Sequence, residues 1–177
     1  MAHSKGANTP NWDLAIECFF QNSPTLILVE AKAHINELSH SGKILKATAS
    51  KKSIENHQKI SSAIHGANNA LSKTFPEIII SINRHYQLSN RIAFSWKLAK
   101  MGFKVILVYL GFTDDKGISD VGKPIEHQQH WQYILETYTS NIPPDSFWNK
   151  WIACGRGSLY ATIKSRTIIE PSKPRGA

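Results

Sequence analysis

Two carboxylates and a lysine are the residues of this chain whose types and spacing could do chemistry together. Glu30 and Lys32 lie near the end of a mainly apolar run that starts at Thr25; the run is too short for a typical helix, and it predicts a buried strand over 25–34. Residues two apart in a strand share a face, so the acid and the base point the same way, and Val29, Ala31 and Ala33 point the other way, into a core. Burying charges is costly unless they are paired, bound to a metal or turned towards a cleft, so this pair marks a candidate site.

The second carboxylate, Asp13, opens a stretch that runs to Phe20 and largely alternates between apolar and polar residues. This alternation predicts a half-buried strand, and the turn-forming residues at 21–24 predict a hairpin with the strand that follows. A close pairing of the open ends of this hairpin would bring Asp13 near Glu30 and Lys32.

Two carboxylates and a backbone carbonyl are hard oxygen ligands, which suit Mg²⁺ or Mn²⁺ better than zinc. An ion held in this way can polarise a phosphoryl oxygen and lower the pKa of a bound water molecule. A neighbouring lysine can orient that water or stabilise charge on the phosphate. The set therefore predicts metal-assisted hydrolysis of a phosphodiester. The alternative is a structural ion pair of Glu30 with Lys32 or with another lysine.

These residues resemble the motif of a known group of enzymes, the PD-(D/E)xK nuclease superfamily. The similarity spans roughly 11–112 and extends to a group of small uncharacterised bacterial members of that superfamily. It is carried, in chain order, by Pro10 to Asp13, by Val29-Glu30-Ala31-Lys32-Ala33-His34 at the end of an apolar strand, by Tyr86 to Phe94, and by the apolar strand that follows.

The resemblance implies a restriction-endonuclease-like fold and a nuclease that cuts DNA with Mg²⁺ or Mn²⁺. Asp13 and Glu30 would hold the ion with the carbonyl oxygen of Ala31, and Lys32 would be the catalytic lysine. Members usually carry a helix and a strand before the motif aspartate. Here the short stretch before Asp13 predicts a loop or tail, so the N-terminus is shortened relative to that pattern.

Three further polar residues are candidates for substrate contact. His34 continues the face of Glu30 and Lys32 and could touch substrate or a metal-bound water; the alternative is a surface or hydrogen-bonded spacer residue. Gln87 and Arg91 lie on a predicted helix, and helices in the resembled superfamily often place a glutamine near the metal. An ordinary hydrogen-bonded helix surface explains both residues equally well.

The remaining pattern predicts an α/β domain with a mixed central sheet and helices on both faces. A short strand competes with a helix at 78–82, where β-branched residues are dense. Apolar spacing and capping residues predict helices from Ser50 or Ser53 to about 72, from 78 to 102 after a capping box at 74–77, and over 126–139, with strands over 103–112 and, near a sheet edge, 159–163.

Composition sets the remaining expectations. The length of 177 residues suits a single domain over 1–177, with flexible tails at 1–10 and 171–177. The formal net charge of +8 attracts phosphate backbones, although it also suits an acidic protein partner. No apolar segment is long enough to span a bilayer, a signal peptide is not evident, and the two cysteines have no metal-binding spacing, so we expect a cytoplasmic protein without a membrane partner.

Taken together, these features predict a Mg²⁺-dependent nuclease that acts on DNA. The competing hypothesis is a non-catalytic module of the same fold that holds nucleic acid or a protein partner. Such a module could act as a homodimer or as a subunit of a larger defence or mobile-element complex.

Overall fold

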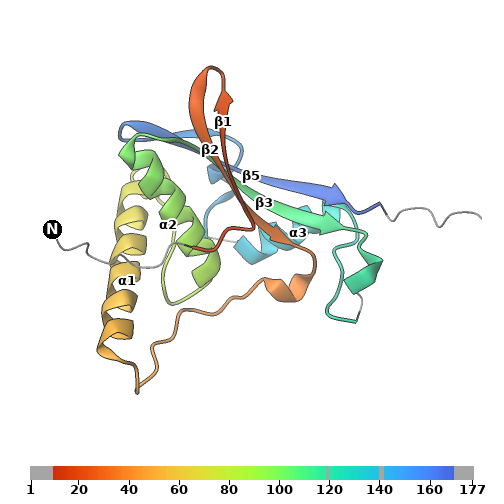
Figure 1. Cartoon of the computed structure of the whole chain (residues 1–177), viewed down its shortest axis with the longest axis horizontal. Helices are drawn as coiled ribbons and strands as arrows, with labels where there is room; N and C mark the ends of the chain where they lie inside the picture. Colours follow the sequence, from red (N-terminus) through yellow and green to blue (C-terminus); the bar gives the residue numbers. More distant parts are fainter. Residues whose placement is uncertain (1–9, 119, 140–141, 170–177) are drawn as a thin grey trace, which may run out of the picture.

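A five-stranded mixed sheet and three α-helices make up the fold of the chain (Figure 1). The computed structural model describes residues 10–118, 120–139 and 142–169; apart from Pro10, the predicted tails lie outside these ranges. In chain order the elements are β1 (Leu14–Phe20), β2 (Ser23–Lys32), α1 (Lys51–Leu71), α2 (Tyr86–Met101), β3 (Lys104–Thr113), α3 (Gln128–Thr139), β4 (Trp151–Cys154) and β5 (Gly157–Thr167). The predicted α/β class, a mixed sheet flanked by helices, is confirmed.

The sheet has a parallel centre and antiparallel edges. Its strand order is β1-β2-β3-β5-β4, in which β2, β3 and β5 run parallel while β1 and β4 pair antiparallel with their neighbours. Parallel neighbours need a long crossover connection, and α1 and α2 supply it between β2 and β3. The mixed sheet that the sequence predicts is therefore confirmed. β5, which contains the strand predicted near a sheet edge, lies next to the edge and not at it, because β4 pairs outside it.

The predicted hairpin forms between β1 and β2. Gln21 and Asn22 make its turn with positive φ angles of 51° and 58°, which the two-residue turn typical of hairpins requires, and Leu14 pairs with Val29 near the open end. The expectation that β1 is half-buried is wrong, since all its side chains are exposed except that of Cys18, which is intermediate. The turn end of the hairpin projects beyond the helices (Figure 1). Phe20 of β1 nevertheless has Trp151 of β4 as a neighbour, at 6.2 Å between ring centres.

All three α-helices lie on one face of the sheet (Figure 1). On that face Leu107 and Tyr109 of β3 are buried, whereas the alternate positions of β3 are only half-buried. The expectation of helices on both faces is therefore wrong for the described residues. The chain moves in one direction across the sheet, from β2 to β3 to β5, and successive crossovers of the same hand then return on the same side.

The helix predicted after the capping box begins only at Tyr86, and residues 78–82 are irregular. Alternate isoleucines of this segment are buried, whereas Ile79 between two of them is 58% exposed, a period of two that a helix does not give. Side-chain oxygens of Asn68 and Ser89 accept two backbone N–H groups of the segment, at 2.9 and 3.1 Å. Side chains of the two flanking helices thus satisfy backbone groups that a helix would have paired internally. Helices α1 and α3 are confirmed close to their predicted bounds.

Strand β3 and helix α3 pack closely against each other at Gly111, and a substitution there can test this packing. A Cβ at this position would lie 2.6 Å from ring atoms of the buried Trp131. We expect Gly111→Ala to lower the free energy of unfolding by about 1–3 kcal/mol, because the core must shift to admit one methyl group. Gly66→Ala on α1 is the control, since nothing lies within 4 Å of its added Cβ. Urea denaturation of both variants measures the difference, and equal midpoints would contradict the packing described here.

Candidate active site

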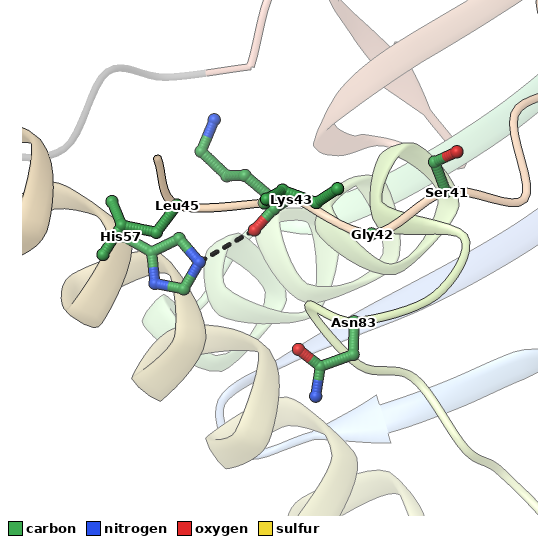
Figure 2. Close-up of a pocket in the computed structure, with 7 residues that line it drawn as sticks. Ser41, Gly42, Lys43, Leu45, His57 and Asn83 are labelled. Atoms are coloured by element: carbon green, nitrogen blue, oxygen red, sulfur yellow. Dashed lines mark hydrogen bonds between the residues drawn. The ribbon is translucent and has the colours of Figure 1, made fainter. Parts of the chain in front are cut away.

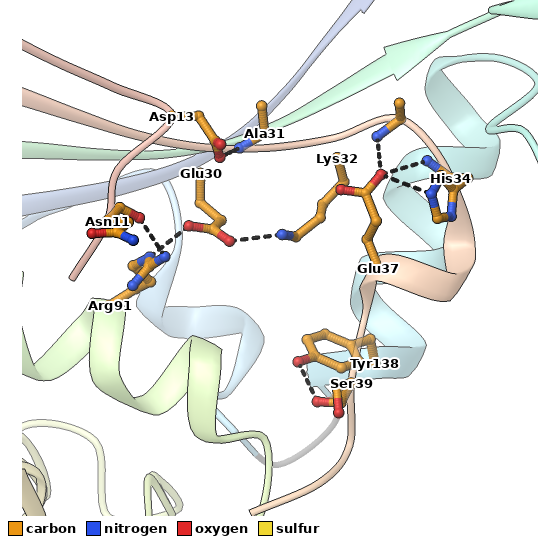
Figure 3. Close-up of polar contacts among 11 residues, drawn as sticks. Asn11, Asp13, Glu30, Ala31, Lys32, His34, Glu37, Ser39, Arg91 and Tyr138 are labelled. Carbon is orange, nitrogen blue, oxygen red and sulfur yellow. Dashed lines mark hydrogen bonds and ion pairs between the residues drawn. The ribbon is translucent and has the colours of Figure 1, made fainter. Parts of the chain in front are cut away.

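A cluster of three charged side chains is buried at the carboxyl end of β2 (Figure 3). Glu30 is 3% exposed, Lys32 7% and Arg91 9%. One carboxylate oxygen of Glu30 accepts a hydrogen bond from Lys32 Nζ at 2.7 Å, and the other accepts one from Arg91 Nε at 2.5 Å. A single carboxylate thus engages two cations, one on each oxygen. We refer to Glu30, Lys32 and Arg91 as the charge cluster.

Two elements bring the charge cluster together. The alternation of β2 places Glu30 and Lys32 on one face, as predicted, and Leu28 of the helix-covered core lies on that same face. Of the residues predicted to point into a core on the other face, Val29 is buried, but Ala31 and Ala33 are only half-buried. The helix-covered core lies instead on the face of Glu30. Helix α2 packs over the neighbouring strands and supplies Arg91 from across the core.

Asp13 lies immediately before β1, beside the backbone of the same strand end (Figure 3). Its N–H donates to the carbonyl oxygen of Val29 at 3.2 Å, and its Oδ2 accepts the N–H of Ala31 at 2.7 Å. The structure therefore brings Asp13 next to the residue that follows Glu30. The two carboxylates differ in environment, since Asp13 is exposed whereas Glu30 is buried.

Arg91 joins the charge cluster to the segment that carries Asp13. Its Nη2 donates to the carbonyl oxygen of Asn11 at 2.7 Å, and its guanidinium lies 4.8 Å from the ring centre of Trp12. The arginine is thus central to the site, where the sequence suggested a more peripheral contact. Gln87, one turn earlier on α2, is exposed and lines a pocket together with Asn11 and Arg91.

His34 lies past the end of β2, in a turn held by Glu37 (Figure 3). One oxygen of Glu37 accepts the N–H groups of Ala33 and His34 at 3.0 and 3.2 Å and lies 3.4 Å from the ring Nε2 of His34. Gly122 approaches the same ring so closely that an added Cβ would lie 2.5 Å from Nδ1. The contacts of His34 are therefore with Glu37 of its own turn and with Gly122. They do not support the substrate contact that the sequence suggested for this histidine.

Two tyrosines that sequence reasoning did not single out are influenced by the charge of Glu30. Tyr109 is the register partner of Glu30; burial, and then the charge of Glu30, raises its pKa well above the ordinary value. Tyr138 donates its hydroxyl to the carbonyl oxygen of Ser39 at 2.9 Å, and burial followed by Glu30 raises its pKa to about 12. Both phenols therefore stay neutral near pH 7, and only the β2–β3 register could have revealed Tyr109.

A histidine pair packs against Tyr138 on the side of α2. His40 Nδ1 and His85 Nε2 are 3.3 Å apart, and the two rings lie 5.0 and 4.7 Å from the ring of Tyr138. His85 is 4% exposed, and burial, then the charges of His40 and Arg84, lowers its pKa below 6.5.

The lowered pKa of His85 predicts a pH-dependent stability. The unfolded chain binds this proton more readily than the folded one, so the stabilising contribution of neutral His85 is complete above pH 6.5 and is lost as the pH falls through the folded pKa. We expect the free energy of unfolding to decrease from about pH 7 to about pH 5 in urea titrations. His85→Asn should flatten this dependence, because it removes the ionisable ring. Asparagine is chosen because it tolerates the φ of 46° at this position. His65→Asn, at an exposed histidine of α1, is the comparison variant, and an identical profile for both variants would contradict the prediction.

The donor set at the strand end consists of atoms that suit a hard divalent ion. Asp13, Glu30 and the carbonyl of Ala31 offer only oxygen ligands, as Mg²⁺ and Mn²⁺ prefer. Within residues 10–118, 120–139 and 142–169, no three acidic, histidine or cysteine side chains gather as ligands. Mg²⁺ sites usually rely on one or two carboxylates, with water and substrate phosphate completing the shell. The residues therefore fit such an ion, provided that Glu30 shares its oxygens with the two cations.

Comparisons with other proteins leave the family of this chain open. No protein-family model, no curated protein and no solved structure matches it. None of the helices described above is both long and apolar enough to cross a membrane.

Proposed function

We propose that this chain is a Mg²⁺- or Mn²⁺-dependent nuclease of the PD-(D/E)xK type that hydrolyses phosphodiester bonds of DNA. The observation that carries the proposal is the buried charge cluster, with the Asp13 carboxylate on the adjacent backbone. Apolar side chains of similar volume often stabilise a core as well as a buried ion pair does, or better. Three buried charges at a strand end therefore support a functional role over a purely structural one.

Formal charge explains how the site would accept a phosphate. Asp13 and Glu30 carry two negative charges and Lys32 and Arg91 carry two positive charges, so the four side chains sum to zero. A divalent ion held by Asp13, Glu30 and the Ala31 carbonyl would supply a Lewis acid and a water of lowered pKa. The loaded site would carry a net positive charge, which suits a phosphodiester.

The two cations would have separate roles in hydrolysis, which adds water across a phosphorus–oxygen ester bond. Lys32, whose ammonium already lies 2.7 Å from Glu30, would orient the attacking water and stabilise negative charge on the phosphoryl oxygens. Arg91 has five N–H donors, of which one bonds Glu30 and another bonds Asn11. Its guanidinium can therefore keep both contacts and hold a phosphate as well.

One feature favours a second candidate, a module that binds DNA or a protein partner without cutting. Both oxygens of Glu30 are engaged by cations, so metal binding would have to compete with Lys32 and Arg91. In such a module the charge cluster would bind a phosphate or an acidic group directly. A stable protein partner that co-purifies with the chain would support the variant of this hypothesis in which it is a subunit of a complex.

Metal binding separates the two candidates. For the nuclease, we expect isothermal titration with Mn²⁺ to show binding, and DNA to be cut with Mg²⁺ but not with EDTA. Asp13→Asn should weaken Mn²⁺ binding by about tenfold or more, because it removes one of two charged ligands. Asp114→Asn is the matched control, since Asp114 is also an exposed aspartate next to a strand end and its φ of 59° suits asparagine. If the wild type neither binds Mn²⁺ nor cuts DNA, the nuclease is rejected in favour of the module.

A further inference from the structure

A polar pocket of about 420 Å³ lies directly beside the charge cluster. Arg91 forms part of its wall, and Asn11, whose carbonyl oxygen accepts from Arg91, forms another part. The rest of the lining combines amide side chains with one aromatic ring, one further cation and two apolar residues: Asn56, Gln87, Asn90, Tyr86, Lys43, Pro10 and Ile60. Aspartate and glutamate are absent from this lining, so the pocket presents positive charge and amide groups but no negative charge.

Two further pockets continue from the first along the segment between β2 and α1. Lys43 lines all three, and His57 lines the second and the third, which lies on the Asn83 side of the segment (Figure 2). The third pocket measures about 440 Å³, and the second also has Lys46 and Asn56 in its lining. Neither of these linings contains an acidic residue. We call the three neighbouring pockets, which share Lys43 in their linings and begin at Arg91, the track.

The backbone that divides these pockets is fixed on both sides. The N–H of Lys43 donates to the carbonyl oxygen of Ile82 at 2.8 Å, and His57 Nε2 donates to the carbonyl oxygen of Lys43 at 2.9 Å (Figure 2). Gly42 lies so close to Asn83 that an added Cβ would meet its backbone at 2.3 Å. The track is therefore held by the fold before any ligand arrives, which lowers the cost of ordering it on binding.

The chemistry of the first pocket matches an unpaired nucleotide. Asparagine and glutamine offer both donors and acceptors to base edges, and aromatic rings stack on bases in single strands. Burial raises the pKa of Tyr86, which outweighs the lowering effect of Arg91, so its phenol is neutral near pH 7. The ammonium of Lys43 lies 4.9 Å over that ring and could contact the phosphate of a nucleotide in the pocket.

From these observations we propose that the track binds single-stranded DNA, with an unpaired base in the pocket beside Arg91. Pockets of at least about 300 Å³ take small ligands, and the first and third exceed that size. The segment around Lys43 separates the pockets, which suits bases that are splayed apart. Bases of a duplex are stacked and cannot enter such compartments unless they are flipped out at a cost. The proposal rests on the proposed function for its choice of DNA, and it adds the form of the strand.

Binding without cleavage tests the track independently of catalysis. A labelled single strand and a duplex of the same sequence are titrated with the full chain in EDTA and followed by fluorescence anisotropy. We expect the single strand to bind about tenfold more tightly, and Lys43→Gln and Gln87→Ala each to weaken it by about fivefold or more. Lys97→Gln is the matched control for charge, because Lys97 is an exposed lysine of α2 outside the linings of these pockets. It should change affinity by less than about twofold.

The remaining outcomes separate the single-strand track from the nuclease proposal. Equal or tighter binding of the duplex, or equal losses for Lys43→Gln and Lys97→Gln, overturns the track even where Mg²⁺-dependent cleavage is present. Selective single-strand binding that the pocket variants weaken supports the track, and if Mg²⁺ then produces no cleavage, only the nuclease proposal is rejected. Circular dichroism of each variant confirms that a loss of binding does not reflect a loss of fold.

Discussion

Replacing Lys32 by alanine is expected to reduce Mg²⁺-dependent DNA cleavage by about 100-fold or more, which is typical of losing one group that stabilises charge in a transition state. Lys32 is the cation nearest to Glu30 on its own strand, at 2.7 Å. Without it, the proposed attacking water and the phosphoryl oxygens would lose the ammonium that orients and stabilises them. Arg91 would still neutralise Glu30, so we expect the fold to persist.

The control for this prediction is Lys164→Ala. Lys164 is an exposed lysine of the parallel strand β5, so the two variants lose the same charge from the same sheet. Cleavage of a labelled oligonucleotide under single-turnover conditions measures the rate, and thermal unfolding checks the fold of both variants. If Lys32→Ala cleaved as fast as the control, the proposed role of Lys32 would be wrong.

The second large effect concerns stability. Glu30 is the only carboxylate that the described contacts place on Lys32 and Arg91, and all three are nearly buried. Glu30→Gln would leave two buried cations without a counter-charge, and breaking a buried pair in this way costs about 3–5 kcal/mol. We therefore expect the midpoint of thermal unfolding to fall by roughly 10 °C for a chain of this size. Loss of activity in this variant alone would not separate chemistry from folding.

A variant with three substitutions resolves that ambiguity. The combined change of Glu30, Lys32 and Arg91 to methionine should recover much of the lost stability, because apolar side chains need no counter-charge. The recovery would be partial, since Arg91 also bonds Asn11 and packs on Trp12. The triple variant should be well folded and unable to cut DNA. If Glu30→Gln were as stable as the wild type, Glu30 would not be the counter-charge that the two buried cations depend on.

Local patterns in the sequence predicted where most helices and strands lie, but little of how they pack together. The turn residues of the hairpin and the apolar spacing of α1 and α3 act within a few residues, so the sequence was enough to locate these elements. Residues 78–82 show the limit of such reasoning. Their β-branched residues suit a strand, and the capping box before them suits a helix. The segment forms neither, because side chains of Asn68 and Ser89 from the neighbouring helices accept its backbone N–H groups.

The sequence by itself determined that Glu30 and Lys32 share a face, because the alternation of side chains is a property of any strand. It also predicted a hairpin whose close pairing would bring Asp13 near them, but the register that does so is known only from the structure. Only the tertiary structure decided that the helices cover the face of Glu30, that Arg91 completes the charge cluster and that Tyr109 lies beside it. These contacts join segments far apart in the chain, and they depend on strand order, crossover side and helix packing, which no local pattern encodes.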